Sequence, residues 1–320
     1  MNQPLAVGID IGGTNTVFGI VDRRGNILYQ GAIKTKDHPD ISVYMDALHK
    51  GVSPLIDKAT ATGDQIKGIG IGAPNGNFYH GTIEFAPNLP WKGVIPLANL
   101  IREQFGFPVE VTNDANAAAI GEMTYGAAKG IKDFIMITLG TGLGSGIVIN
   151  GQLVYGHDGF AGELGHVVVE REGRHCGCGR YGCLETYVSA TGIVRTMLEL
   201  LREKKTDSVM RDMKTEDITS KAICDAALEG DQLAQEAVDY TANILGMALA
   251  NYIAFSAPEA IVLFGGLARA GDLLIEPTRR YMNDNVLRIW KDKVKLINSE
   301  LRESDAAILG ASALVWEMKE

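Results

Sequence analysis

A cluster of thiols and one imidazole marks the middle of the chain. Cys176, Cys178 and Cys183 are close together in sequence, and His166 precedes them. Thiolates and a neutral imidazole are ligands that Zn2+ prefers, and four of them complete a tetrahedral structural site. The glycines between the cysteines allow the tight loop that would turn several sulfur atoms inward. We therefore predict a structural zinc site formed by these four side chains.

Two other interpretations of the cluster are less favoured by the sequence. The segment could be a glycine-rich surface loop with reduced thiols, but the chain has one further cysteine, Cys224, so three of its four cysteines gather here. It could instead carry disulfides, but neighbouring Cys-x-Cys residues are poorly placed to bridge each other. Disulfides are also rare in the reducing cytoplasm, where we expect this protein. The zinc site is the preferred interpretation.

Composition and charge restrict the function classes. The chain has 320 residues, which suits two domains, and its hydrophobic content of 46% is that of an ordinary soluble protein. Its net charge of -9 argues against a nucleic-acid partner, which would require a basic face. The N-terminal apolar run has no basic segment before it and reaches Asp10 at once, unlike a signal peptide. The apolar stretch 244–268 is interrupted by Asn251 and Pro258, so we expect no membrane span and a cytoplasmic location.

A strand–glycine–strand pattern occurs twice, at a spacing of about 130 residues. In the first copy, a strand from Leu5 leads to Gly12-Gly13-Thr14 and a second strand follows. In the second copy, the strand 133–139 leads to a glycine turn over 140–146, beginning Gly140-Thr141-Gly142, and then to another strand. A dinucleotide fingerprint would continue as a helix, so these turns are hairpin tips. Their backbone N–H groups can bind phosphate, to which Thr14 adds a hydroxyl.

Two further features suggest nucleotide contacts. Asp10, before the first glycine turn, could lie near Mg2+ on the phosphates, through water, because Mg2+ holds its hydration shell tightly. Its alternative role is a strand-end aspartate bonded to turn amides. Gly265 and Gly266 follow an apolar strand and could allow close approach of an adenosine. Their alternative role is packing between a strand and a helix.

The remaining elements predict an α/β protein of two related domains that face each other. Further strands are expected at 27–30, 66–72, 109–112, 260–264 and 294–297. Helices are expected at 42–60, 97–105, 113–125, 188–204, 218–228, 232–252, from 272 onward, and at 305–319. The last helix is predicted to be amphipathic and to pack on the first domain.

Asp114 is the candidate for proton transfer. It lies where a strand meets a helix N-terminus, and the positive end of the helix dipole favours an ionised carboxylate there. Such a carboxylate can accept a hydroxyl proton as the oxygen attacks a phosphoryl group. The alternative is that Asn113 or Asp114 caps the helix.

A set of polar side chains could bind a sugar, whose hydroxyls both donate and accept hydrogen bonds. The set consists of Asn88, Asn113, Asp114, Glu163, His166 and Glu185. An imidazole can bind a hydroxyl through one nitrogen and a metal through the other. Taken singly, each of these residues is typical of an ordinary loop, and only the set as a whole indicates a sugar site.

Together these motifs resemble the ROK family of sugar kinases and repressors. The resemblance runs from Asp10 to the final helix. It is carried by residues 10–14, 87–89, 113–117, 139–142, 162–166 and 176–185. It implies an actin-like (ribonuclease-H-like) two-domain ATPase fold with a cleft between the domains. The smaller domain would comprise 1–112 plus about 305–320, and the larger domain 113–304 with the cysteine loop.

The resemblance also implies an activity, its cofactors and its residues. The reaction would be ATP-dependent phosphorylation of a hexose at its 6-hydroxyl, with Asp114 as the base and Mg2+ and structural Zn2+ as further cofactors. The six polar residues above would contact the sugar, and His166 with the three clustered cysteines would bind zinc. The nucleotide would be bound by Asp10, Gly12, Gly13, Thr14, Gly140, Thr141, Gly142, Gly265 and Gly266. A homo-oligomer, a dimer or tetramer, is expected.

Glucose is the preferred acceptor, because the Glu163–His166 pair resembles that of the family's glucokinases. The alternatives are N-acetylglucosamine, N-acetylmannosamine, mannose, fructose and allose. An alternative of another class is a sugar-responsive transcriptional regulator, but a first strand near Leu5 leaves no room for a DNA-binding domain before it. In the turn 73–76, Asn75 stands where the family more often has glycine, and it could alter sugar specificity.

Overall fold

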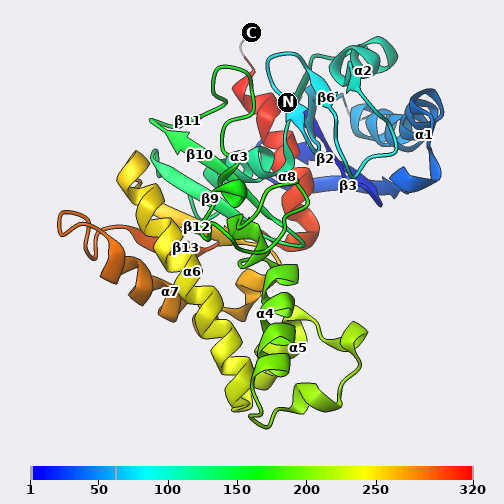
Figure 1. Cartoon of the computed structure of the whole chain (residues 1–320). Helices are drawn as coiled ribbons and strands as arrows, with labels where there is room; N and C mark the ends of the chain where they lie inside the picture. The colour runs from blue at the N-terminus through cyan, green and yellow to red at the C-terminus, as the bar shows by residue number, and fades with distance from the viewer. Residues whose placement is uncertain (1–2, 62, 319–320) are drawn as a thin grey trace. The chain divides into compact units, whose positions relative to one another are not determined.

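The structure is a computed structural model that describes residues 3–61 and 63–318 (Figure 1). The chain forms two compact units, each with its own sheet and core. The first unit comprises Met1–Gly130, Leu153–Ala161 and Glu300–Glu320. The second comprises Ile131–Gln152 and Gly162–Ser299. Within the described part of the chain, we find no helix that combines the length and the apolar character needed to cross a bilayer.

The sheet of the first unit has the strand order β3-β2-β1-β4-β8. Its strands are β1 (Pro4–Ile11), β2 (Thr16–Asp22), β3 (Ile27–Ile33), β4 (Gln65–Gly72) and β8 (Val109–Thr112). The first three pair antiparallel, while β4 and β8 run parallel to β1. The carboxyl ends of β1, β4 and β8 therefore meet at one edge of the sheet.

Helices cover both faces of this sheet because side chains alternate along β1. Val7 and Ile9 are buried with Tyr44 and Leu48 of α1 (Ile41–Thr60). The intervening Gly8 faces the opposite side, where α8 (Glu303–Glu317) packs against β1 and β4. Helices α2 (Leu97–Phe105) and α3 (Asp114–Tyr125) complete the unit with a small sheet of β5 (Gly76–Asn77), β6 (Thr82–Glu84) and β7 (Val94–Ile95).

The sheet of the second unit repeats the order of the first, as β11-β10-β9-β12-β13. Its strands are β9 (Phe134–Leu139), β10 (Leu143–Ile149), β11 (Gln152–Leu153), β12 (Ala260–Phe264) and β13 (Lys295–Asn298). Strands β9 and β10 pair antiparallel, and β12 runs parallel to both β9 and β13. The two strand–glycine–strand copies read from the sequence thus begin two sheets of the same topology.

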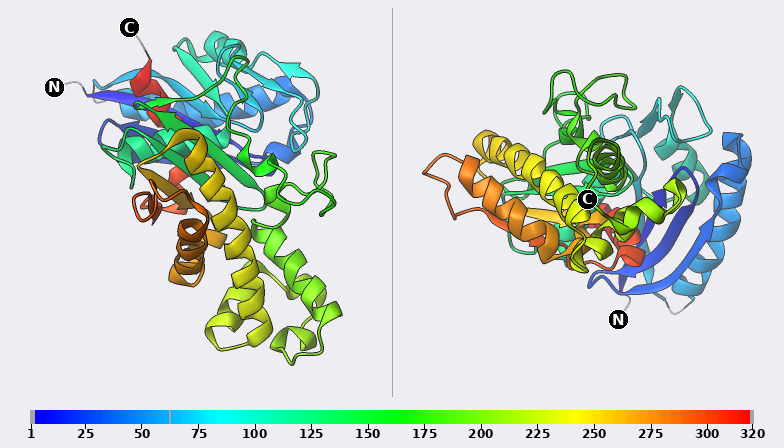
Figure 2. Two further views of the ribbon diagram at one scale, coloured as in Figure 1. Left: turned by 60° about the vertical axis from the view of Figure 1, so that its left-hand side comes forward. Right: turned by 60° about the horizontal axis from the view of Figure 1, so that its bottom comes forward.

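Helices of the second unit cover the face of its sheet that carries Ile135 and Ile137. They are α4 (Ala190–Glu203), α5 (Ser220–Leu228), α6 (Gln232–Ser256) and α7 (Asp272–Asn285). Figure 2 shows α6 and α7 side by side along their length. Short 3-10 turns lie at Thr35–Asp37, Leu164–His166, Leu184–Thr186, Val209–Asp212, Thr215–Asp217 and Leu267–Ala270.

The last helix differs from its prediction. Helix α8 was expected to be amphipathic, but residues 308–315 along it are buried on every side. One side packs on β1 and β4, where glycines let the helix backbone touch the sheet, since a Cβ at Gly70 would overlap the backbone of Ala311. Another side packs on α3, where Gly121 meets Gly310. Packing on two sides leaves no polar face, and the predicted end at Lys319 lies outside the described residues.

Two predicted boundaries also differ. The second glycine turn was expected to extend over 140–146, but β10 already begins at Leu143, and Gly144 and Gly146 lie within paired strand. The predicted larger domain began at 113, whereas the first compact unit continues to Gly130. The reason is the contact of α3 with α8, which joins two segments that are distant in sequence.

Candidate functional site

Two carboxylates of the first unit lie close together at the carboxyl edge of its sheet. Asp10 is near the end of β1, and Asp114 begins α3 directly after β8. Strand β4 lies between these two strands and ends at Gly72. A Cβ built on Gly72 would lie 3.3 Å from Asp10 Oδ1 and 3.7 Å from Asp114 Cα. The side chain that glycine lacks therefore leaves space in which both carboxylates approach each other.

Burial and mutual repulsion change how these groups ionise. Burial raises the pKa of Asp10 to about 7, and the neighbouring charge of Asp114 contributes. Surrounding protein also raises the pKa of Asp114 by reducing the hydration of its carboxylate, although part of the residue reaches solvent. The amide of Ala115 opposes this rise by donating to Asp114 Oδ1 at 2.9 Å. Two carboxylates this close to each other can bind a cation or transfer a proton.

The raised pKa of Asp10 predicts a pH dependence of stability. Between about pH 4 and pH 7 the folded protein keeps a proton on Asp10 that the unfolded chain releases, so the unfolding free energy should fall as pH rises through this window. Asp10→Asn removes the charge and should flatten this decline. Urea unfolding of the metal-free protein from pH 4.5 to 8 measures it, with Asp46→Asn on the exposed face of α1 as the control. An unchanged pH slope in Asp10→Asn would contradict the assignment.

Asn113 occupies the cap of α3. Its Oδ1 accepts from the amide of Asn116 at 2.6 Å, so the capping alternative is what the structure shows for this side chain. The cap positions Asp114 as the first helical residue. Asn116, two residues on, is fully buried, and among the described residues its side-chain amide has no hydrogen-bond partner. Asn116 had no predicted role, and its burial next to Asp114 makes it a further candidate residue of the site.

The first glycine turn contacts the loop that carries Asn88. Gly12 donates its N–H to the carbonyl of Asn15 at 2.9 Å, which closes the turn. A Cβ on Gly13 would lie 2.5 Å from the carbonyl oxygen of Asn88, so the two backbones touch. Thr14 and Asn88 are both exposed. The predicted phosphate turn and one predicted sugar contact are therefore neighbours.

A buried aromatic pair anchors this loop. Trp91 packs against Tyr44 of α1 with ring centroids 4.3 Å apart, and its indole N–H donates to the carbonyl of His38 at 3.1 Å. The hydroxyl of Tyr44 bonds to that of Thr16 on β2 at 2.9 Å. These contacts tie the loop of Asn88 to the sheet.

Asn75 has a structural explanation. Its φ is +53°, a left-handed conformation that favours glycine and that asparagine also tolerates. Its side-chain amide donates to the carbonyl of Glu84 at 2.9 Å, and the Glu84 N–H donates back to the Asn75 carbonyl. The side chain that replaces glycine here is thus engaged in holding the turn.

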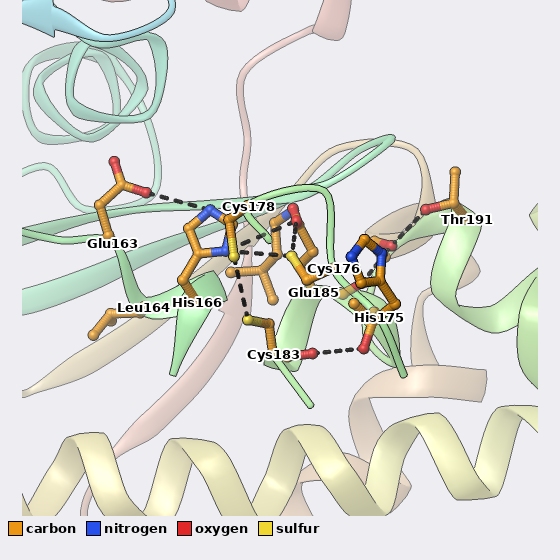
Figure 3. A network of polar contacts seen from close by, with 12 residues as sticks. Glu163, Leu164, His166, His175, Cys176, Cys178, Cys183, Glu185 and Thr191 are labelled. Carbon is orange, nitrogen blue, oxygen red and sulfur yellow. Dashed lines mark hydrogen bonds and ion pairs between the residues drawn. The ribbon is translucent and has the colours of Figure 1, made fainter. Parts of the chain in front are cut away.

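In the second unit, the predicted zinc ligands converge (Figure 3). Ligand atoms of His166, Cys176, Cys178 and Cys183 all lie within 4.8 Å of one another. The Cys176 sulfur is 3.6 Å from His166 Nδ1, and the sulfurs of Cys178 and Cys183 are 3.7 Å apart. Three thiols and an imidazole at these separations fit a tetrahedral Zn2+ site. Cys224 instead lies in the hydrophobic core of the unit.

Burial affects two of these thiols. It raises the pKa of both Cys176 and Cys183 above the usual range of a thiol. A metal binds the thiolate form, so binding must release these protons. Acid should therefore weaken metal binding at this site.

The carboxylates of Glu163 and Glu185 lie on either side of the candidate metal site. His166 turns Nδ1 toward Cys176, while its Nε2 lies 4.0 Å from Glu163 Oε2, so its two nitrogens face different partners. Glu185 Oε1 lies 3.2 Å from the Cys176 sulfur and 3.9 Å from His166 Nδ1. The sequence-predicted sugar contacts Glu163, His166 and Glu185 are thus neighbours around one point.

The second glycine turn, Gly140–Gly142, also contacts Glu185. Gly140 donates to the carbonyl of Gly142 at 3.0 Å, and the Leu143 amide donates to Glu185 Oε2 at 3.2 Å. A Cβ on Gly142 would lie 2.5 Å from that oxygen, whereas Gly140 has open space beside it. This turn therefore has room for a ligand next to Gly140.

Gly265 and Gly266 differ from each other. Gly265 has φ +100°, and a Cβ there would lie 2.7 Å from the carbonyl of Leu139, so packing against β9 requires glycine. The alternative expected from the sequence was packing between a strand and a helix, whereas the close neighbour of Gly265 is the end of strand β9. Gly266 has open space where a Cβ would lie, so it can still admit a ligand.

The sequence did not indicate two residues, Ser145 and Tyr252, that bond to the backbone on either side of Glu163. Ser145 of β10 donates its hydroxyl to the carbonyl of Gly162 and accepts from the Leu164 amide at 3.1 Å. Tyr252 of α6 donates to the carbonyl of Leu164 at 2.8 Å. Ser145 was assigned to the glycine turn. The inward position of a strand alternation would have been the signal for it.

The chain is similar to known proteins over nearly its whole length. The family model described as "ROK family" matches residues 6–318. A glucokinase of Halalkalibacterium halodurans is 36% identical over 100% of this chain and 97% of its own length. A xylose repressor of Caldicellulosiruptor bescii is 30% identical over 97% of this chain and 77% of its own length. The crystal structure of a ROK family glucokinase from Streptomyces griseus with glucose and AMPPNP is 33% identical, covers 98% of this chain and 100% of that one, and has a TM-score of 0.80.

Proposed function

Because this chain belongs to the ROK family and shares its actin-like two-domain fold, we propose that it is an ATP-dependent hexokinase that converts glucose to glucose 6-phosphate. The observation that carries the proposal is the position of Asp114. It begins α3 at the edge of the sheet, beside Asp10 and in the same unit as the glycine turn that touches Asn88. A carboxylate base in the same unit as a phosphate-binding turn suits phosphoryl transfer to a hydroxyl.

The proposal assigns roles to each unit. In the first unit, Asn88, Asp114 and the side-chain NH2 of Asn113, whose oxygen caps α3, hold sugar hydroxyls, and Gly12–Thr14 holds phosphate oxygens. In the second unit, Glu163, His166 and Glu185 hold sugar hydroxyls, and the turn Gly140–Gly142 with Gly266 contacts the nucleotide. Gly265 shapes the strand end beside it. These assignments are supported by the two clusters of neighbouring side chains described above.

Proton transfer is the chemical task of Asp114. It accepts the proton of the sugar 6-hydroxyl as that oxygen forms a bond to the γ-phosphorus of ATP. The bond from the γ-phosphorus to the bridging oxygen breaks, and ADP leaves with the electron pair. Its raised pKa makes Asp114 a stronger base than an ordinary aspartate once it is ionised.

Two metal ions belong to the proposal. Asp10 would lie near Mg2+, which neutralises phosphate charge when bound. His166, Cys176, Cys178 and Cys183 would hold Zn2+, which supplies rigid bonds to the loop and to the imidazole when bound. His166 then orients Nε2 toward Glu163 and the sugar, because Nδ1 faces the sulfurs. Acquisition of zinc also requires the release of thiol protons.

A coupled assay of ADP release tests the function. The purified protein is offered glucose and, separately, N-acetylglucosamine, N-acetylmannosamine, mannose, fructose and allose, with ADP release without sugar as the background. We expect glucose to give the highest kcat/KM. Calorimetric binding of a sugar without any ADP release would instead support a sugar-responsive regulator, the activity class of the repressor relative. The expected dimer or tetramer stays a prediction, which sedimentation velocity measures.

A further inference from the structure

A buried arginine holds the cysteine loop, Cys176–Cys183, against helix α4. Arg174 is 9% exposed, and its guanidinium lies 4.5 Å above the ring of Tyr187. Nε and Nη2 donate to the two carboxylate oxygens of Glu199, Nε at 3.0 Å. Nη2 also donates to Thr196 Oγ1 at 2.9 Å, a second contact to α4.

The same guanidinium reaches the segment that follows the loop. Nη1 donates to the carbonyl of Thr186 at 2.8 Å and to that of Gly192 at 3.2 Å. Thr186 directly follows Glu185. We call Arg174 and its partners Thr186, Gly192, Thr196 and Glu199 the arginine clamp. The clamp therefore fixes the backbone next to Glu185 on the first turns of α4.

The backbone of Arg174 joins both ends of the cysteine loop. Its N–H donates to the hydroxyl of Tyr187 at 3.0 Å, and its carbonyl accepts from the amide of Gly182 at 2.8 Å. Gly182 immediately precedes Cys183, and Arg174 lies two residues before Cys176. Movement of Arg174 would therefore move two metal-ligating positions together.

The start of α4 is bonded in turn to the second glycine turn. The amide of Ala190 donates to the carbonyl of Gly140 at 2.8 Å, and the hydroxyl of Thr191 donates to the carbonyl of Thr141 at 2.8 Å. Ser189 Oγ donates to the carbonyl of Glu185 at 2.7 Å. Cysteine loop, Glu185 and glycine turn are thus all attached to one helix terminus.

The contacts of Arg174 require an arginine. A buried charge is costly unless its partners are well placed, and breaking such a pair is strongly destabilising. Arginine offers five donors in a rigid planar fork, and here they reach carboxylate, hydroxyl and carbonyl groups in different directions. A lysine carries the charge but not the fork, so it cannot reproduce this set of contacts.

We infer that Arg174 is a positioning residue that fixes the cysteine loop on α4 and thereby couples the metal site to the second glycine turn. The inference rests on the proposed function, because it assigns the turn to the nucleotide and the loop to zinc. Loss of the clamp should then affect both the metal site and the second glycine turn. Zinc should leave faster, and the KM values of ATP and glucose should rise together while kcat changes less.

Three variants and one control test the clamp. Arg174→Met removes the donors, Arg174→Lys keeps the charge without the fork, and Glu199→Gln weakens the partner at a half-exposed position. Arg280→Met is the control, since Arg280 forms an exposed pair with Asp239 in the same unit. Zinc release into a chromogenic chelator is followed after thermal melts show that each variant is folded. We expect release from both Arg174 variants to be about ten-fold faster, as for other residues that support metal ligands.

The outcomes separate the inference from the proposed function. If wild-type protein binds zinc and turns over while Arg174→Met and Glu199→Gln match it in zinc release and both KM values, the clamp has no positioning role. If wild-type protein binds zinc without turnover, the proposed function is wrong, yet faster zinc release from the Arg174 variants would still support the clamp. Wild-type protein that takes up no zinc overturns the metal assignment and the clamp with it, whereas ADP release with glucose would still support the proposed function. Full rescue by Arg174→Lys would also overturn the argument from the fork.

Discussion

Asp114→Asn protein is expected to bind glucose with nearly unchanged affinity and to lose most of its turnover, by about 10²–10⁴-fold, the usual contribution of a positioned general base. The substitution keeps the size of the side chain and an oxygen that can accept from the Ala115 amide, as Asp114 Oδ1 does. It removes the carboxylate that takes the hydroxyl proton. Glucose binding is measured by calorimetry, and turnover by ADP release at saturating glucose and ATP.

Asp40 provides the matched control for this variant. It also lies at a helix start, where its side chain caps α1 by accepting from the amides of Ser42 and Val43. Asp40→Asn preserves a good cap and should leave turnover unchanged. If Asp114→Asn phosphorylated glucose as fast as the wild type, the assignment of the base would be wrong. A loss confined to glucose affinity would make Asp114 a binding residue instead.

Cys178→Ser protein is expected to lose its zinc and to need much more glucose for half-maximal rate, by about ten-fold or more. The reason is geometric. Without the metal, His166 Nδ1 loses a fixed partner among the sulfurs, and its Nε2 no longer holds a defined position beside Glu163. Zinc content is measured by elemental analysis of protein purified without chelators, and the KM of glucose by the ADP-release assay.

Cys224→Ser controls for the loss of a thiol. Cys224 is buried in α5 within the hydrophobic core and lies outside the four-residue cluster. Its substitution should cost some stability, because it places a hydroxyl in the core, but should leave zinc content intact. Stoichiometric zinc in Cys178→Ser, or the absence of zinc from wild-type protein, would overturn the metal assignment.

Local features of the site were readable from the sequence. The cysteine loop could be predicted because its ligands are close in the chain, so a short turn brings them together whatever the rest of the fold does. The glycine turns were recognised because strand patterns flank them, and helix α2 was predicted at its observed bounds, Leu97–Phe105. Helix α3 was expected from 113, with Asn113 or Asp114 as its possible cap, and the structure places the cap at Asn113 and the first helical residue at Asp114.

Other features required the arrangement of distant segments. Asp10 and Asp114 become neighbours because β1 and β8 both pair parallel with β4, which brings the carboxyl ends of the three strands together. This strand order depends on pairing between segments that are far apart in the sequence. Helix α8 is buried on two sides because α3 covers it. Residues 306–315 carry no charged side chain, a pattern that indicates burial on every side but does not show which elements cover the helix. The domain boundary expected at 113 differs from the compact units for the same reason.

By itself, the sequence determined the motifs, the repeated strand–glycine–strand unit and the cluster of cysteines, because each depends on residues within one turn or hairpin. The tertiary structure decided which of these motifs meet. It brought Asp10 and Asp114 close together and placed Ser145 against the backbone on both sides of Glu163. It also attached both the cysteine loop and the second glycine turn to the start of α4 through Arg174 and its partners. Local propensity acts over a few residues, whereas burial and hydrogen bonding join segments that only the completed fold brings into contact.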